Sequence, residues 1–261
     1  MVKNLSRRIV KMLDFQLTKM RCLSLAAVLF PAISHPLVPT TSPIAKSHTV
    51  AVGRTGFSYA DSARLNDLYD QLQLENLGLS ADAYHKAIAG FLTLVMSGQV
   101  RNPGVLSIID FSRPSTEKRL FVLDMYNGAV LFNTLVAHGR NSGKLLATRF
   151  SNRVNSLMSS LGFYLTGDAF MGQHGYSLRL EGKEKGWNDN AFHRCIIMHP
   201  ADYVSEEHIE QYGYLGRSEG CPAIPEELDR PVIDSIRGGS CLFIYSPNSR
   251  YLHQSGVMMA G

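Results

Sequence analysis

The chain has 261 residues, 45% of them hydrophobic and 18% charged, a composition ordinary for a globular protein that can bury one large core. Its formal net charge is +4, but residues 1–34 hold six lysines and arginines and one aspartate, so the remaining residues carry about −1. A nearly neutral body lacks the basic surface that nucleic-acid binding requires, and nucleic acid is therefore excluded as a partner.

Residues 1–34 have the composition of a secretory leader. A cationic segment precedes the apolar run 22–30, and Ala32 and Ser34 place small residues where cleavage before His35 needs them. The apolar run is shorter than the roughly 20 residues of a membrane-spanning helix. We expect export to the periplasm or cell envelope without a stable transmembrane span. An uncleaved interfacial anchor is the alternative, and Met20 is an alternative start.

Residues 35–56 contain three prolines among small residues and predict an extended linker. Residues 57–100 predict a helical hairpin. Its first helix carries apolar residues at helical spacing and is expected to end at Gly78. Its second helix is expected to begin after a Ser80 cap and to end at Gly98. The buried face of that second helix is predicted as Tyr84, Ile88, Phe91, Leu92 and Val95.

Residues 101–261 are predicted to form a mainly β domain with some α. Strands are expected at 105–111, 120–125, 129–137, 176–181, 195–199 and 241–245. The pair Asn127-Gly128 predicts a type I′ hairpin turn. A helix is expected over 225–237, with Pro231 kinking or interrupting it. The strands do not alternate regularly with helices, as a parallel α/β fold would require.

The cysteines point to a nucleophile. Outside the leader there are three, Cys195, Cys221 and Cys241, an odd number whose spacing suits no metal site. Cys195 and Cys241 lie in apolar runs and are expected to be core thiols. Cys221 instead lies between Gly220 and Pro222, in the polar sequence Gly-Arg-Ser-Glu-Gly-Cys-Pro-Ala. We therefore interpret Cys221 as a catalytic thiol.

His199 ends an apolar strand upstream of this motif and is the candidate base, or one half of a preformed thiolate–imidazolium pair. Pro222 and Pro225 suggest that Cys221 precedes a helix, whose positive end would favour the thiolate. Either Ser218 or a backbone carbonyl near Tyr203 would orient the imidazole.

Three further residues are candidates for substrate binding. The backbone N–H groups of Gly220 and Cys221 could form an oxyanion hole. Arg217 could bind a carboxylate through its fork of donors, or could be a solvated surface arginine. His174, like His138, either lines a pocket or has a structural role.

His199 followed by Ser-x-Gly-Cys, a short helix and a strand resembles the L,D-transpeptidase (YkuD-like) catalytic domain, most closely its murein L,D-transpeptidase branch. The likeness covers about 105–245 and includes VAHGRNSGK, SSLGFYLTG, GQHGYSLRLEG, the WNDNAFHR segment leading to IIMH, and GRSEGCPAIP. It implies a mixed, mainly β sandwich in which Cys221 attacks a peptidoglycan stem peptide between a diamino acid and terminal D-Ala. His199 would be the base, and no cofactor would be needed.

Two positions depart from the wider pattern. Glu219 stands where the family usually has His, and Pro222-Ala223 follows the cysteine where Asn or Arg is common. Three functions are open. The leading one is an exported transpeptidase, the second is an L,D-carboxypeptidase or endopeptidase with water as acceptor, and the third is a non-catalytic wall-binding module. The acyl acceptor, the preferred diamino acid and the oligomeric state are not determined by the sequence.

Overall fold

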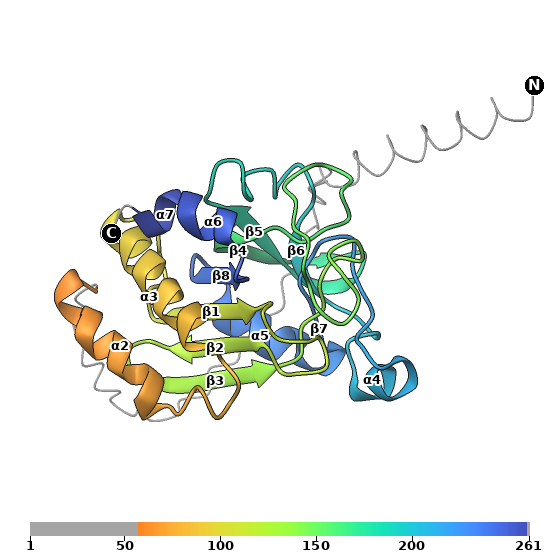
Figure 1. The fold of residues 1–261 in the computed structure, drawn as a ribbon, viewed down its shortest axis with the longest axis horizontal. Helices are drawn as coiled ribbons and strands as arrows, with labels where there is room; N and C mark the ends of the chain where they lie inside the picture. Colours follow the sequence, from red (N-terminus) through yellow and green to blue (C-terminus); the bar gives the residue numbers. More distant parts are fainter. Residues whose placement is uncertain (1–56, 260–261) are drawn as a thin grey trace, which may run out of the picture. The chain divides into compact units, whose positions relative to one another are not determined.

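A helical hairpin precedes the sheet, as predicted (Figure 1). The computed structural model describes residues 57–259, so the expected leader and linker lie outside the described residues. The hairpin contains a short 3-10 helix and two α-helices: η1 (Tyr59–Asp61), α2 (Ser62–Gln71) and α3 (Ala81–Met96). Ser80 caps α3 by accepting a hydrogen bond from the Ala83 N–H at 3.3 Å.

The end of α2 differs from the prediction. The helix stops at Gln71, well before Gly78, and Gln73 adopts a positive φ of 50°. Residues 72–78 then form turns, and Gly78, with φ of 91°, ends these turns rather than the helix. The expected end of α3 at Gly98 is confirmed, since the helix stops at Met96 and Gly98 has φ of 70°.

Eight strands form one hydrogen-bonded order, β3-β2-β1-β8-β4-β5-β6-β7. Their bounds are β1 (Val105–Asp110), β2 (Leu120–Asp124), β3 (Ala129–Thr134), β4 (Gly162–Gly172), β5 (Gly175–Gly182), β6 (Ile197–Pro200), β7 (Ala223–Ile224) and β8 (Cys241–Tyr245). Neighbours are antiparallel except β1 with β8 and β6 with β7, which are parallel. The strand-rich mixed fold expected from the sequence is confirmed.

Several details of the sheet differ from the prediction, among them one long strand and one turn. The longest strand, β4, was missed, because three glycines at 162, 167 and 172 interrupt its apolar pattern. The turn between β2 and β3 is not of type I′, since Gly128 has a positive φ but Asn127 does not. The Asp124 carboxylate instead accepts the N–H groups of Tyr126 and Asn127.

Helices cover both faces of the sheet. Gly90 of α3 lies against the Phe163 ring of β4, and a Cβ at that position would be only 2.0 Å from the ring. On the other face, the hydroxyl of Thr166 in β4 donates to the Ile236 carbonyl of α5, and Tyr176 of β5 donates to Asp234. The helices after the first hairpin are α4 (Glu206–Tyr212), η2 (Glu226–Leu228), α5 (Asp229–Ile236), α6 (Ser249–Gln254) and α7 (Gly256–Met259).

Pro231 does not kink the predicted helix. It lies in the first turn of α5, where the backbone N–H has no partner within the helix and proline is tolerated. The helix expected over 225–237 is therefore divided at Asp229 rather than at Pro231, into a 3-10 turn, η2, followed by α5.

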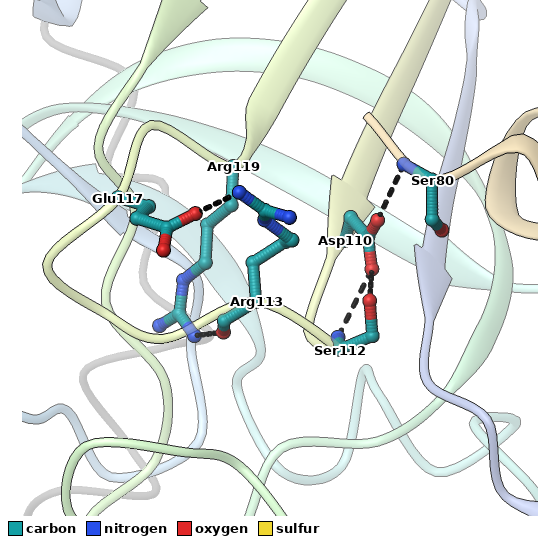
Figure 2. A network of polar contacts seen from close by, with 6 residues as sticks. All are labelled: Ser80, Asp110, Ser112, Arg113, Glu117 and Arg119. Carbon is teal, nitrogen blue, oxygen red and sulfur yellow. Dashed lines mark hydrogen bonds and ion pairs between the residues drawn. The ribbon is translucent and has the colours of Figure 1, made fainter. Parts of the chain in front are cut away.

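A polar network joins the hairpin to the sheet (Figure 2). Asp110, the last residue of β1, accepts hydrogen bonds from the backbone N–H groups of Ser80 and Ser112, each at 3.0 Å. Next to it, Arg113 pairs with Glu117, and Arg119 donates to the Arg113 carbonyl at 2.8 Å. The network fixes the start of α3 against the end of β1.

Residues 57–259 fall within one compact unit, which begins at Thr55. Within them, the structure contains no helix with both the length and the apolar character needed to cross a membrane. In Figure 1, α4 and β7 lie at the end of the molecule away from α2 and α3. The residues predicted to be reactive are found at this end.

Candidate active site

The parallel pairing of β6 with β7 brings the two predicted reactive residues together. His199 pairs with Ala223, and its N–H donates to the Pro222 carbonyl at 3.3 Å. Cys221 immediately precedes this ladder. Backbone hydrogen bonds thus hold His199 against the segment that directly follows Cys221.

The imidazole of His199 is oriented by a backbone carbonyl. Nδ1 lies 2.8 Å from the Pro200 oxygen, which only accepts, so Nδ1 carries the proton and Nε2 is an acceptor. Of the two expected orienting groups, Ser218 is ruled out because its hydroxyl bonds Cys221 and Gly220, and the group found is a backbone carbonyl, that of Pro200 rather than one closer to Tyr203. Burial lowers the pKa of His199; the Pro200 contact raises it and nearby His174 lowers it.

The Cys221 side chain is half-buried, and its thiol donates to the Cys195 carbonyl at a sulfur–oxygen distance of 3.6 Å. Burial raises the pKa of this thiol to about 11, although the Ile197 N–H and the Arg194 guanidinium lower it. The expected help from a helix N-terminus next to Cys221 is absent, because β7 (Ala223–Ile224) follows the cysteine and the predicted helix begins only with η2 at Glu226 and α5 at Asp229. The resting pair is therefore a thiol and a neutral imidazole.

The Ser218 side chain stabilises the turn formed by residues 218–221, which contains the Cys221 thiol. Its hydroxyl donates to the Cys221 carbonyl at 2.6 Å and accepts the Gly220 N–H at 3.1 Å. The Gly220 carbonyl in turn accepts from the Ser159 hydroxyl at 3.2 Å. The Gly220 N–H is thus already bonded, which corrects its expected role in an oxyanion hole.

The segment after β3 supports the motif from the other side. The Ser218 N–H donates to the His138 carbonyl, and the Ala137 N–H donates to the Ala223 carbonyl. His138 is fully buried, and its Nδ1 accepts from Arg119 at 2.8 Å. Burial, together with the nearby Arg119 charge, lowers the pKa of His138 to about 3. His138 is therefore a neutral structural residue.

The remaining predicted residues lie at the rim. His174, in the turn between β4 and β5, is exposed and stacks on His199 with ring centroids 4.6 Å apart. Arg217 donates to the Gly143 carbonyl at 3.3 Å and lies over the Tyr214 ring. Glu219 is 73% exposed and pairs with Arg140 at 3.1 Å. Only His174 of these three contacts one of the two reactive side chains.

A model of the L,D-transpeptidase catalytic domain matches residues 75–245, well over half of the chain. The chain belongs to this family. No curated protein matches the sequence. The family assignment therefore rests on the match to the domain as a whole.

Solved structures of L,D-transpeptidases are distant relatives. The one from Xylanimonas cellulosilytica is 15% identical, with 83% of this chain and 100% of that chain covered and a TM-score of 0.32. The one from Stackebrandtia nassauensis is 11% identical, with coverages of 73% and 80% and a TM-score of 0.33. The one from Mycobacterium smegmatis is 13% identical, with coverages of 55% and 59% and a TM-score of 0.34. The chain thus spans less than two thirds of the mycobacterial structure.

The other two cysteines of this transpeptidase domain differ in environment. Cys241 is buried in β8, as expected for a core thiol. Cys195 was expected inside a strand, but it is exposed, precedes β6 and has φ of 51°. Among residues 57–259, no group of histidines, cysteines and carboxylates is arranged to hold a metal ion.

The sequence interpretation missed two groups in the transpeptidase site. The Pro200 carbonyl has no side-chain signature and follows only from the register of β6. Arg194 ends the WNDNAFHR segment, which carried the family resemblance, but nothing in its spacing indicated that its guanidinium contacts the Ser-x-Gly-Cys turn.

Proposed function

We propose that this protein is an exported cysteine acyltransferase that acts on peptidoglycan stem peptides. The observation that carries the proposal is the pairing of β6 with β7, because it sets His199 beside the turn holding Cys221. The Nδ1 contact with Pro200 supports it, since it leaves Nε2 available to accept a proton.

In the first half-reaction, Nε2 of His199 takes the Cys221 proton as Sγ attacks the carbonyl carbon between the diamino acid and D-Ala. The tetrahedral intermediate collapses, the carbon–nitrogen bond breaks, and the imidazolium gives its proton to the leaving amine of D-Ala. A thioester on Cys221 remains. The neutral resting pair favours this general-base route over attack by a preformed thiolate.

In the second half-reaction, an acceptor amine attacks the thioester carbon and passes its proton to His199. The carbon–sulfur bond breaks, and the returning proton restores the thiol. Water in place of the amine would make the same chain a carboxypeptidase or endopeptidase. The chemistry is the same, and only the acceptor admitted to the thioester differs.

Incubation with purified tetrapeptide muropeptides tests the proposal. We expect mass spectrometry to detect released D-Ala together with cross-linked dimers, and Cys221→Ala to abolish both. D-Ala release without dimers would replace transpeptidation by hydrolysis. A protein that binds peptidoglycan but releases no D-Ala would be a wall-binding module.

A strained carbapenem lactam provides a substrate-independent check, because its carbonyl acylates an activated thiol. We expect a covalent adduct on intact protein that disappears in Cys221→Ala. An adduct that persists in this variant would identify a different nucleophile.

Export is the second part of the proposal and rests on the cationic and apolar pattern of residues 1–34. Fractionation of cells expressing the full chain tests it. We expect the protein in the periplasm or envelope, and its retention in the cytoplasm after deletion of residues 1–34.

A further inference from the structure

The Arg194 guanidinium fastens a neighbouring segment to the reactive turn. Its Nη1 donates to the Ser151 carbonyl at 2.6 Å and to the Ser160 hydroxyl. Its Nη2 donates to the Met158 carbonyl and to the Ser156 hydroxyl at 3.3 Å. Four contacts from one side chain thus hold residues 151–160 in place.

The same guanidinium touches the backbone of the motif. A Cβ added to Gly220 would lie 2.9 Å from Nη2 of Arg194 and 2.7 Å from the Met158 carbonyl oxygen. Gly220 also has a backbone φ of 128°, a conformation that residues other than glycine rarely adopt. Two constraints therefore require glycine before Cys221. The first is the positive φ, and the second is that Arg194 and Met158 occupy the space that a Cβ would need.

Arg194 is the positive charge that acts on the thiol. Of the charged groups that perturb the pKa of Cys221, Arg194 lowers it and Glu219 raises it. Glu219 lies largely in solvent and is paired with Arg140, which weakens its field. The half-buried Arg194 is screened less. The neutral His199 supplies no positive charge before proton transfer.

The donors of Arg194 define how it acts. Nη1 and Nη2 of Arg194 each donate two hydrogen bonds to protein oxygens. Neither nitrogen therefore has an N–H group left for a substrate carboxylate. Arg217 is less fully bonded, since its Nη1 makes one long hydrogen bond with the Gly143 carbonyl. Arg194 is thus a positioning residue that acts through Cys221 and the 151–160 segment.

We propose that Arg194 provides the fixed positive charge that stabilises the Cys221 thiolate as it forms, while clamping residues 151–160 against Gly220. The role rests on the proposed function of Cys221 as nucleophile. Its test does not need peptidoglycan, because thiolate formation is measured by alkylation alone. Failure to turn over muropeptides would therefore leave this test unaffected.

The experiment measures the rate at which iodoacetamide alkylates Cys221 between pH 6 and 11, followed by mass spectrometry in a Cys195→Ser background. We expect Arg194→Gln to raise the apparent pKa of Cys221 by about one unit, which slows alkylation roughly tenfold below that pKa. Arg153→Gln is the matched control, since this arginine is exposed in the same segment. It should titrate like the parent.

Arg194→Lys separates charge from shape, because lysine keeps the charge and loses the fork. We expect its thiol pKa to stay within a few tenths of the parent while its melting temperature falls. A parental pKa in Arg194→Gln would overturn the proposal. A full-unit rise in Arg194→Lys would also overturn it, and this variant decides the matter alone if Arg194→Gln does not fold.

Discussion

The ring of His174 stacks on the ring of His199, with centroids 4.6 Å apart and planes inclined by 29°. One imidazole thus covers another at the opening of the site, and a positive charge on His174 disfavours a second on His199. This contact links the turn between β4 and β5 to the acid–base chemistry of the neighbouring strand.

The stack predicts a shift in the pH profile. Replacing His174 with Phe keeps an aromatic ring over His199 but removes its charge, so the pKa of His199 should rise. The acidic limb of carbapenem acylation should then move a few tenths of a unit to higher pH. Stopped-flow acylation rates between pH 4 and 9 measure it. A shift to lower pH would show that His174 does not act through its charge.

The neutral resting pair predicts how the thiol responds to pH. Because burial holds the pKa of Cys221 near 11, alkylation by iodoacetamide should rise about tenfold per pH unit from pH 7 to 10. A preformed thiolate–imidazolium pair would instead react at a constant rate across this range. Alkylation of the substrate-free protein distinguishes the two, and a plateau at neutral pH would contradict the structure.

Ser218 is predicted to act through the turn rather than through His199. Ser218→Ala removes the hydrogen bonds to Gly220 and Cys221, and we expect it to cost about 1–3 kcal/mol of unfolding free energy. Turnover should fall because the thiol is less firmly held. Denaturant unfolding and muropeptide kinetics measure both. Ser218→Thr retains the hydroxyl and should keep most of the activity, whereas an unchanged Ser218→Ala would rule out the role.

Gly220→Ala should be far more harmful than an alanine at another glycine with positive φ. At Gly220 the new Cβ meets Met158 and Arg194, whereas at Gly186, with φ of 82°, it meets nothing within 4 Å. We expect about 1 kcal/mol of destabilisation at Gly186 and distinctly more at Gly220. Thermal melts of the two variants give the comparison. Equal melting temperatures would refute the close packing around the motif.

Glu219 is predicted to restrain the thiol only weakly. It raises the pKa of Cys221, so Glu219→Gln should lower that pKa and speed alkylation near pH 8. Because the side chain is exposed and paired with Arg140, the change should be small and should shrink as salt is added. Alkylation at low and high ionic strength provides the measurement. Slower alkylation in the variant would reverse the assigned sign.

Much of the fold was accessible from periodicity. Helix α3 and strands β1, β2 and β8 carry apolar patterns strong enough to be read locally, and Ser80 marks a helix start in the sequence. β4 was not accessible in this way. Its glycines allow other residues to pack closely against the strand, as Glu184 does against Gly162. This requirement comes from the tertiary structure and is not visible in the local sequence.

The placement of His199 on a strand beside the Cys221 motif was also predictable, but the contacts around these two residues were not. Cys221 stood out by its polar neighbours, and His199 by its place at a strand end. The bonds of Ser218, Pro200 and Arg194 depend on how β6, β7 and the 151–160 segment are arranged in space. Cys195 shows the same limit, since an apolar neighbourhood suggested burial and its positive φ turns it outward.

The short ladder of β6 and β7 has a consequence for the segment that joins these two strands. The chain leaves the sheet after Pro200, forms α4, and returns to the same backbone ladder at Ala223. Insertions within this excursion should therefore leave His199 in place beside the Cys221 turn, because the pairing of β6 with β7 is made where the excursion starts and finishes.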